Sequence, residues 1–149
     1  MLRRVPGARL AIVGDGPQRD ELERLFPADR TSFVGYMTGA ELADAYATAD
    51  LFVYASETET MGNVVLEAMA SGLPVVAPRA GGIPNLVRER ETALLYAAGD
   101  AIDAATHVNT LLADDAERRR IAAAVAAKRR NGIGPVRPSA CAITIVEPF

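Results

Sequence analysis

Two acidic residues that flank a glycine are the part of this sequence best suited to ligand chemistry. Glu59 and Glu67 lie eight positions apart, and Gly62 stands between them. The sequence between Gly62 and Gly72 predicts a helix that is apolar on nearly every side, with Glu67 as its one charged residue. Such a helix is normally buried, and a buried carboxylate needs a hydrogen-bond donor. We therefore expect Glu67 to be buried and to meet a donor on the protein or on a ligand.

The backbone before this helix suits an anion. Thr60, Met61 and Gly62 lead the chain to the helix N-terminus, where N–H groups and the helix dipole favour a phosphate. One turn further on, the Glu67 carboxylate can accept two hydrogen bonds from a cis-diol. Phosphate and diol together describe the ribosyl phosphate of a nucleotide. The alternative is a structural pair between Glu67 and an arginine such as Arg79.

The surrounding sequence predicts a parallel α/β sheet that positions these groups. Short apolar runs predict strands at 10–13, 33–35, 51–54, 74–77 and 93–96. Helices are expected between them. One starts from Pro17 with an apolar stripe of Leu22, Leu25 and Phe26, one lies between Gly62 and Gly72, and the others lie at 38–49, 84–87, 103–112 and 115–125. Thr38 and Glu41 predict a capping box. Parallel strands share a carboxyl edge where ligands bind, so four strand ends should meet there: Gly14, Gly35, Ser56 and Ala77.

Several motifs in this order resemble the group-one retaining glycosyltransferases. They are the Glu59–Glu67 pair around Gly62, the run Leu66–Val76, Ala80–Gly82 and Val13–Pro17. The resemblance covers about Arg9 to Ala127. It implies the C-terminal, donor-binding half of a GT-B fold, which consists of two Rossmann-like halves. Within the family, Thr58–Thr60 and Ala80–Pro84 look most similar to sulfoquinovosyl- and mannosyl-transferring members.

The resemblance also implies a role for each candidate residue. Glu67 would hold the ribose, and Glu59, as the catalytic residue, would orient the hydroxyls of the donor sugar. The backbone at the mouth of the helix would receive the diphosphate; its residues are Thr60, Met61, Gly62, Asn63 and Val64. The remaining candidates are Gly14 and Gly16 in the first loop, Tyr36 beside the nucleobase, and Gly81 and Gly82 beside the donor sugar. Ordinary turns and a surface aromatic are the structural alternatives for these five.

The implied reaction transfers a sugar from a nucleotide-diphosphate sugar to a hydroxyl acceptor with retained anomeric configuration. We expect no cofactor and no protein-bound metal, since no Asp-x-Asp motif is present. The alternative is a non-catalytic nucleotide-sugar-binding or partner module that completes its site with another chain, which an exposed apolar sheet edge would favour. A single histidine, His107, argues against an epimerase or phosphorylase of the same fold. The absence of G-x-G-x-x-G after the first strand argues against a dinucleotide dehydrogenase.

The family pattern predicts how the chain is divided. Residues 1–127 would form the donor domain without its first strand, without the Arg and Lys that clamp the diphosphate, and without the N-terminal GT-B domain. We expect such a chain to bind nucleotide weakly and to transfer no sugar alone. Residues 128–149 read as an irregular tail in which the strand-like run 142–146 has no evident partner. A frameshift after Asn131 is our hypothesis for this tail, and the coding DNA tests it.

Composition excludes several classes of function. A net charge of −3 over 149 residues gives no general attraction to nucleic acid. One cysteine, Cys141, excludes an internal disulfide framework. No apolar run is long enough to span a bilayer and no signal peptide is evident, so a cytoplasmic location is the default expectation. Arg118–Arg120 and Lys128–Arg130 could touch an anionic membrane surface peripherally, but a solvated helix face is the favoured interpretation.

Overall fold

The protein has a Rossmann-like α/β fold built on one six-stranded parallel sheet. The structure is a computed structural model that describes residues 5, 7–56, 62–128 and 141–145. The strands are β1 (Arg9–Val13), β2 (Thr31–Gly35), β3 (Leu51–Tyr54), β4 (Val75–Pro78), β5 (Ala93–Tyr96) and β6 (Cys141–Ile145). The helices are α1 (Arg19–Leu25), α2 (Gly39–Thr48), α3 (Asn63–Ala70), α4 (Ile83–Leu86), α5 (Ala101–Ala113) and α6 (Asp115–Lys128). The predicted alternation of strands and helices is confirmed.

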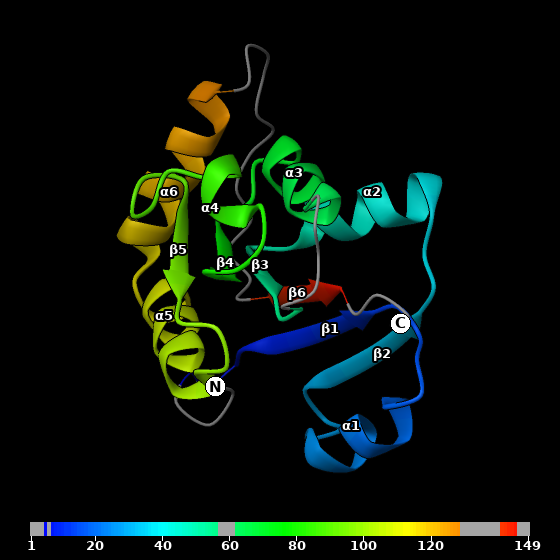
Figure 1. Cartoon of the computed structure of the whole chain (residues 1–149). Coiled ribbons are helices and arrows are strands. Elements are labelled where there is room, and N and C mark those ends of the chain that lie inside the picture. Colours follow the sequence, from blue (N-terminus) through cyan, green and yellow to red (C-terminus); the bar gives the residue numbers. More distant parts are fainter. Residues whose placement is uncertain (1–4, 6, 57–61, 129–140, 146–149) are drawn as a thin grey trace.

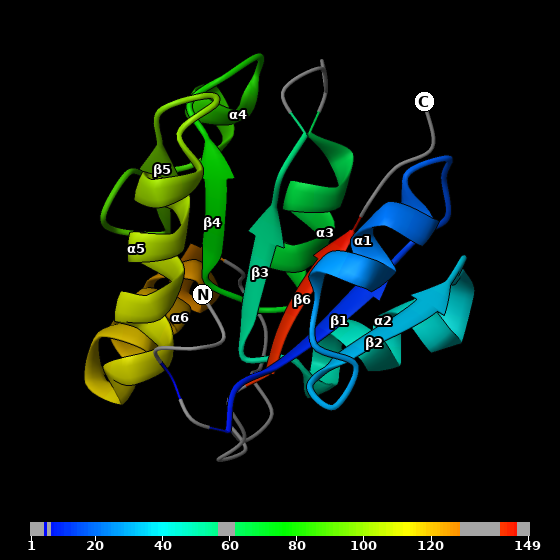
Figure 2. The same cartoon turned by 90° about the horizontal axis from the view of Figure 1, so that it is seen from below.

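The strand order β2-β1-β6-β3-β4-β5 places the last strand of the chain at the centre of the sheet (Figures 1 and 2). On one side β6 pairs with β1, from Arg9 opposite Cys141 to Val13 opposite Ile145. On the other side it pairs with β3, where Tyr54 also lies opposite Ile145. Every strand pair is parallel. The loops that follow the strands therefore leave from one carboxyl edge, as the sequence predicted.

The position of β6 corrects one expectation. The strand-like run near the end of the chain was expected to have no partner, yet residues 141–145 pair on both sides. They occupy the gap between β1 and β3, where an exposed apolar edge would have favoured a module completed by another chain. No such edge lies between β1 and β3. The frameshift hypothesis and the division at residue 127 stay predictions.

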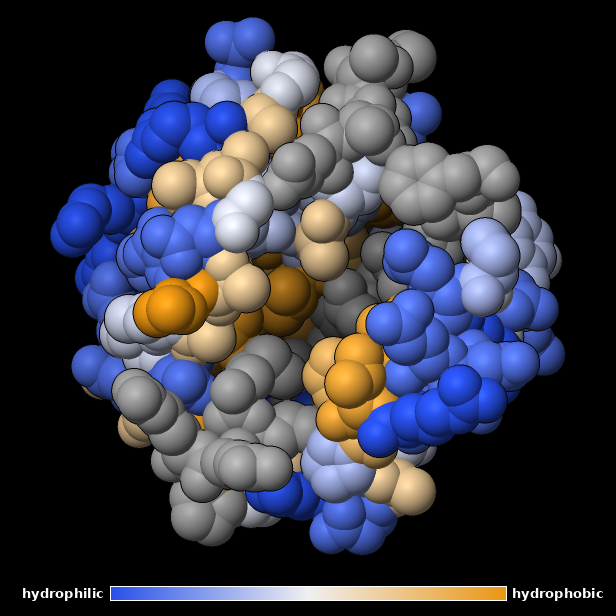
Figure 3. Space-filling model, turned by 60° about the horizontal axis from the view of Figure 1, so that its bottom comes forward, coloured by the Kyte–Doolittle hydropathy of each residue, from blue (hydrophilic) through white to orange (hydrophobic). Residues whose placement is uncertain are grey.

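Helices cover both faces of the sheet. In Figure 2, α1 and α5 lie in front of the sheet, and α2, α3 and α6 lie behind it. The strands β4 and β5 are buried on both faces, since all four residues of each are buried. From nearly the same side, Figure 3 shows a hollow with hydrophobic residues at its floor. An apolar floor does not suit a diphosphate, so the polar loops of the carboxyl edge are the better place to seek a nucleotide site.

Helix α3 begins at Gly62, and this residue needs to be a glycine. Gly62 has φ 63° and ψ 30°, the left-handed conformation that costs other residues about 1 kcal/mol or more. A Cβ added to Gly62 would also lie 2.6 Å from Leu86 Cδ1 of α4. From this start, α3 packs four apolar residues inward: Val64, Val65, Ala68 and Met69. The turn at Gly62 thus sets the direction of α3 and its contact with α4.

Two local predictions are wrong in detail. Helix α1 itself buries no residue and Leu25 of the predicted apolar stripe is 70% exposed, whereas Phe26 of that stripe is partly buried against the core. Thr38 does precede α2 as its N-cap residue, but its side chain makes no capping hydrogen bond. The capping box with Glu41 is therefore not formed. Neither error moves a strand or changes the carboxyl edge.

We predict that Gly62→Ala lowers the free energy of unfolding by roughly 1–2 kcal/mol, from backbone strain and the displacement of Leu86. Urea denaturation followed by circular dichroism measures this loss. Gly72→Ala is the matched control for backbone strain without a steric clash. Gly72 also has a positive φ, 84°, but a Cβ added there meets nothing within 4 Å. Gly16→Ala, which has neither feature, should be nearly neutral. Equal stability of the Gly62 and Gly16 variants would contradict this description of the turn.

We also predict that Arg9→Cys forms an intrachain disulfide with Cys141. The two residues are Cα partners on neighbouring parallel strands, about 4.8 Å apart, which is within disulfide range. Mild oxidation followed by peptide mass analysis detects the bond. Ala11→Cys is the control, because Ala11 is the Cα partner of Ile143 and not of Cys141. Cross-linking at equal yield in both variants, or in neither, would show that β6 does not lie in this register.

Candidate functional site

The carboxyl edge brings together loops that are far apart in the sequence. The Gly14 N–H donates to the Gly35 carbonyl oxygen at 2.7 Å, which joins the loops after β1 and β2. Asp15 folds back onto this loop, since its Oδ1 accepts a hydrogen bond from the Gly16 N–H at 2.9 Å. Tyr36 follows Gly35 and is 73% exposed. The structure therefore places Gly14, Gly16 and Tyr36 at one end of the edge, with the Tyr36 ring in solvent.

A second group of candidates meets around the start of α3. Gly81, with φ 54°, and Gly82, the N-cap residue, lead into α4. Leu86 of α4 lies closest to the Cβ position at Gly62. Two glycine motifs twenty residues apart in the sequence are therefore in contact through α4. This packing leaves Asn63 exposed and Val64 buried at the first turn of α3.

The first turn of α3 retains the features of an anion site. It contains no acidic residue. The first N–H groups of any helix lack partners within the helix, and the dipole adds partial positive charge there. Glu59, Thr60 and Met61 lie outside the described residues, so their predicted roles stay predictions. So does the diphosphate role of Gly62, Asn63 and Val64.

Glu67 corrects the first expectation made from the sequence. It is exposed, not buried, because α3 packs against the sheet on one face only. The neighbouring Leu66 is also exposed, at 43%. The apolar composition of the helix gave no sign of which side faces solvent. The carboxylate of Glu67 is therefore accessible to a ligand from solvent.

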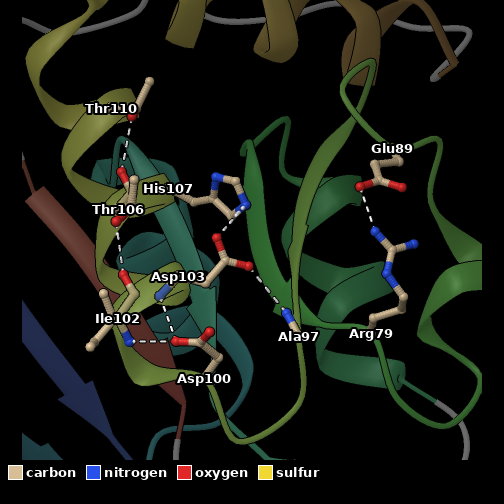
Figure 4. Close-up of polar contacts among 9 residues, drawn as sticks. All are labelled: Arg79, Glu89, Ala97, Asp100, Ile102, Asp103, Thr106, His107 and Thr110. Atoms are coloured by element: carbon tan, nitrogen blue, oxygen red, sulfur yellow. Dashed lines mark hydrogen bonds and ion pairs between the residues drawn. The ribbon is translucent and has the colours of Figure 1, made fainter.

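The structural alternative for Glu67, an ion pair with Arg79, is not formed. Arg79 instead pairs with Glu89, with 2.6 Å between Nη2 and Oε1 (Figure 4). This hydrogen bond holds the pKa of Glu89 below its usual range and raises the pKa of Arg79. Among the described residues, Glu67 forms no ion pair. Its carboxylate instead accepts a hydrogen bond from the hydroxyl of Tyr46 on α2, a residue that the sequence did not single out.

A polar cluster lies beside this edge, where β5 passes into α5 (Figure 4). Asp100 caps α5 by accepting hydrogen bonds from the Ile102 and Asp103 N–H groups. Asp103 accepts from the Ala97 N–H at 3.2 Å and lies 3.5 Å from His107 Nε2. His107 is thus partly buried and paired, not fully exposed. The cluster is satisfied by its own members, which indicates a structural role.

The basic cluster Arg118–Arg120 is also occupied within the protein. Arg118 is 6% exposed, donates to the Leu111 carbonyl oxygen at 3.0 Å and pairs with Asp115. Arg120 pairs with Glu117 and donates to the Arg90 carbonyl oxygen at 2.7 Å. The expectation of a fully solvated face is wrong for Arg118, which links α6 to the end of α5. The side chains of Lys128–Arg130 lie outside the described residues.

The described residues contain neither a metal cluster nor a membrane span. No group of three or more His, Cys, Asp or Glu residues in this part of the chain could hold a metal ion. Within the same residues, no helix has the length and apolar character needed to cross a bilayer. The arrangement that remains is an exposed carboxylate beside a helix N-terminus, at the carboxyl edge of a parallel sheet. The carboxyl edge is where open α/β folds bind nucleotides.

Comparison of the sequence with known proteins finds similarity to glycosyltransferases. The chain is 49% identical over 124 residues to the sulfoquinovosyl transferase SQD2 of Arabidopsis thaliana, which covers 81% of this chain and 24% of that protein. It is 42% identical over 137 residues to a GDP-mannose-dependent alpha-mannosyltransferase of Mycobacterium tuberculosis, which covers 89% of this chain and 33% of that protein. The chain thus spans between a quarter and a third of the length of these relatives.

Comparison with solved structures agrees with this similarity in sequence. HepE of Anabaena, solved in complex with UDP, superposes with a TM-score of 0.73 at 32% identity, over 83% of this chain and 36% of HepE. The family model of glycosyl transferases group 1 matches residues 1–114. The predicted resemblance, including its likeness to sulfoquinovosyl- and mannosyl-transferring members, is confirmed. The chain belongs to the group 1 glycosyl transferases.

Proposed function

We propose that this chain carries the donor-binding site of a retaining glycosyltransferase and that the donor is a nucleotide-diphosphate sugar. The observation that supports this most directly is Glu67, an exposed carboxylate without an ion pair among the described residues, one turn inside a helix that begins at a left-handed glycine. HepE is solved with UDP and with UDP-glucose, and one relative is named for GDP-mannose. All three of these ligands carry a ribose and a diphosphate.

We assign the parts of the donor to the edge as follows. The ribose diol donates to Glu67, and the diphosphate lies against the backbone at Gly62, Asn63 and Val64. Tyr36 and the loop at Gly14 and Gly16 lie farther along the edge, on the side proposed for the nucleobase. The sugar lies toward Gly81 and Gly82, where Glu59 would orient its hydroxyls. The acceptor is not assigned to any described residue.

The proposed chemistry follows from this placement. The bond between the anomeric carbon and the diphosphate oxygen breaks, and a bond to the acceptor hydroxyl oxygen forms on the same face of the sugar. The hydroxyl proton is released to water, and negative charge collects on the departing nucleoside diphosphate. Helix N–H groups that point at this charge would lower the barrier electrostatically. No described arginine or lysine is assigned to the diphosphate, and Arg79, Arg118 and Arg120 are held in ion pairs. We therefore expect weak nucleotide binding and no sugar transfer by the 149-residue chain alone.

We predict that Glu67→Gln weakens binding of UDP or GDP by about 10- to 100-fold, because a neutral amide with one accepting oxygen replaces the carboxylate that accepts two charge-assisted hydrogen bonds from the ribose. The same change should alter binding of the 2′,3′-dideoxy nucleotides little, because they cannot donate these hydrogen bonds. NMR titration measures dissociation constants in the millimolar range that we expect. The wild-type chain should prefer the ribonucleotide, and the variant should have lost most of this preference.

Glu91→Gln is the matched control. Glu91 is an exposed acid paired with Arg88, and it precedes β5 at the opposite, amino edge of the sheet. Its loss should leave both dissociation constants unchanged. If the wild-type chain bound ribo- and dideoxynucleotides equally, the proposed role of Glu67 would be wrong. Binding of neither nucleotide at millimolar concentration would overturn the proposed donor site itself.

A further inference from the structure

The hydroxyl of Tyr46 is held rigidly at the surface of the core. Tyr46 lies on α2 and is only 3% exposed. Its ring packs edge-on against Phe52 of β3, with 5.9 Å between ring centroids and 62° between the ring planes. Phe52 is itself fully buried. Because a tyrosine has few rotatable bonds, a ring fixed in this way also fixes the position of its hydroxyl oxygen.

From this position the hydroxyl contacts the residue proposed to hold the ribose. Tyr46 Oη donates to Glu67 Oε2 at 3.4 Å, and this contact joins α2 to α3 across 21 positions of the sequence. Glu67 is exposed, and an exposed glutamate normally samples several rotamers. A fixed donor reduces that freedom. The side chain of Glu67 is therefore directed by a residue that the sequence motif does not contain.

The chemical type of this donor matters for the site. An arginine would neutralise the carboxylate and occupy both of its oxygens with a bidentate pair. A tyrosine hydroxyl is neutral and supplies one hydrogen bond, here to Oε2. Among the described residues no ion pair neutralises Glu67 and no donor is bound to its Oε1, so the charge and Oε1 stay available to a ligand. One donor from the protein and two from a cis-diol are within the accepting capacity of a carboxylate, which is about four lone pairs.

We propose that Tyr46 is a positioning residue for ribose recognition: its buried hydroxyl sets the rotamer of Glu67 before the nucleotide binds. This inference rests on the proposed function of Glu67. It assigns part of the preference for a ribose to a core residue on a different helix. Tyr46 itself contacts the carboxylate, and the ligand is bound by Glu67.

The test compares Tyr46→Phe with the wild-type chain in binding to UDP and to its 2′,3′-dideoxy analogue. The variant retains the ring that packs on Phe52 and removes only the hydroxyl. We expect binding of UDP to weaken by about 3- to 10-fold, as the loss of one preorganising hydrogen bond implies. Binding of the dideoxy analogue should stay unchanged. If Tyr46 had a purely structural role, its substitution would weaken the binding of both nucleotides to the same extent.

Tyr96→Phe is the matched control, because Tyr96 is also buried and its hydroxyl donates to the Tyr54 carbonyl oxygen at 3.0 Å. It should lower stability without changing the ratio of the two dissociation constants. An unchanged ratio in Tyr46→Phe, together with a lost preference in Glu67→Gln, would overturn the role of Tyr46 and leave the proposed function intact. No preference for UDP in the wild-type chain would overturn both.

Discussion

Parallel pairing of the strands is the constraint on which the rest of this structure depends. Because all six strands run in one direction, the loops that follow them leave from one edge, and residues from 14 to 82 can share a site. β6 has a special part in this arrangement, since β1 and β3 are hydrogen-bonded to it and not to each other. One five-residue strand therefore holds the pair β2-β1 in register with the group β3-β4-β5.

The proposed site at the carboxyl edge depends on the way α3 begins. Helix α3 starts at the left-handed turn of Gly62, and the proximity of Leu86 ties that turn to α4. One turn later Glu67 faces solvent, where Tyr46 holds its carboxylate without neutralising it. A core residue, a backbone turn and an exposed acid thus act together. Positive N–H groups and a negative carboxylate lie on one short helix, which matches the phosphate and the diol of a nucleotide.

The features of the fold and of the candidate site that could be predicted from the sequence are those that depend on neighbouring residues. The continuous apolar runs of β3 and β5 place both strands to the residue, because strands buried on both faces leave no other pattern. The exposure of Glu67 could not be predicted, since a helix that is apolar all round does not reveal its outer side. The pairing of β6 and the contact of Tyr46 with Glu67 join distant parts of the chain. Neither leaves a periodic signal in the sequence.

The central claim is that the diphosphate of a nucleotide sugar binds across the start of α3. The most direct measurement is a heteronuclear NMR titration of the isotope-labelled chain with UDP-glucose and, separately, GDP-mannose. The account predicts that the largest amide shifts occur at Asn63, Val64 and Glu67, with smaller shifts at Gly14 and Gly16. It would be contradicted if these amides stayed unchanged while residues of α5 and α6 shifted.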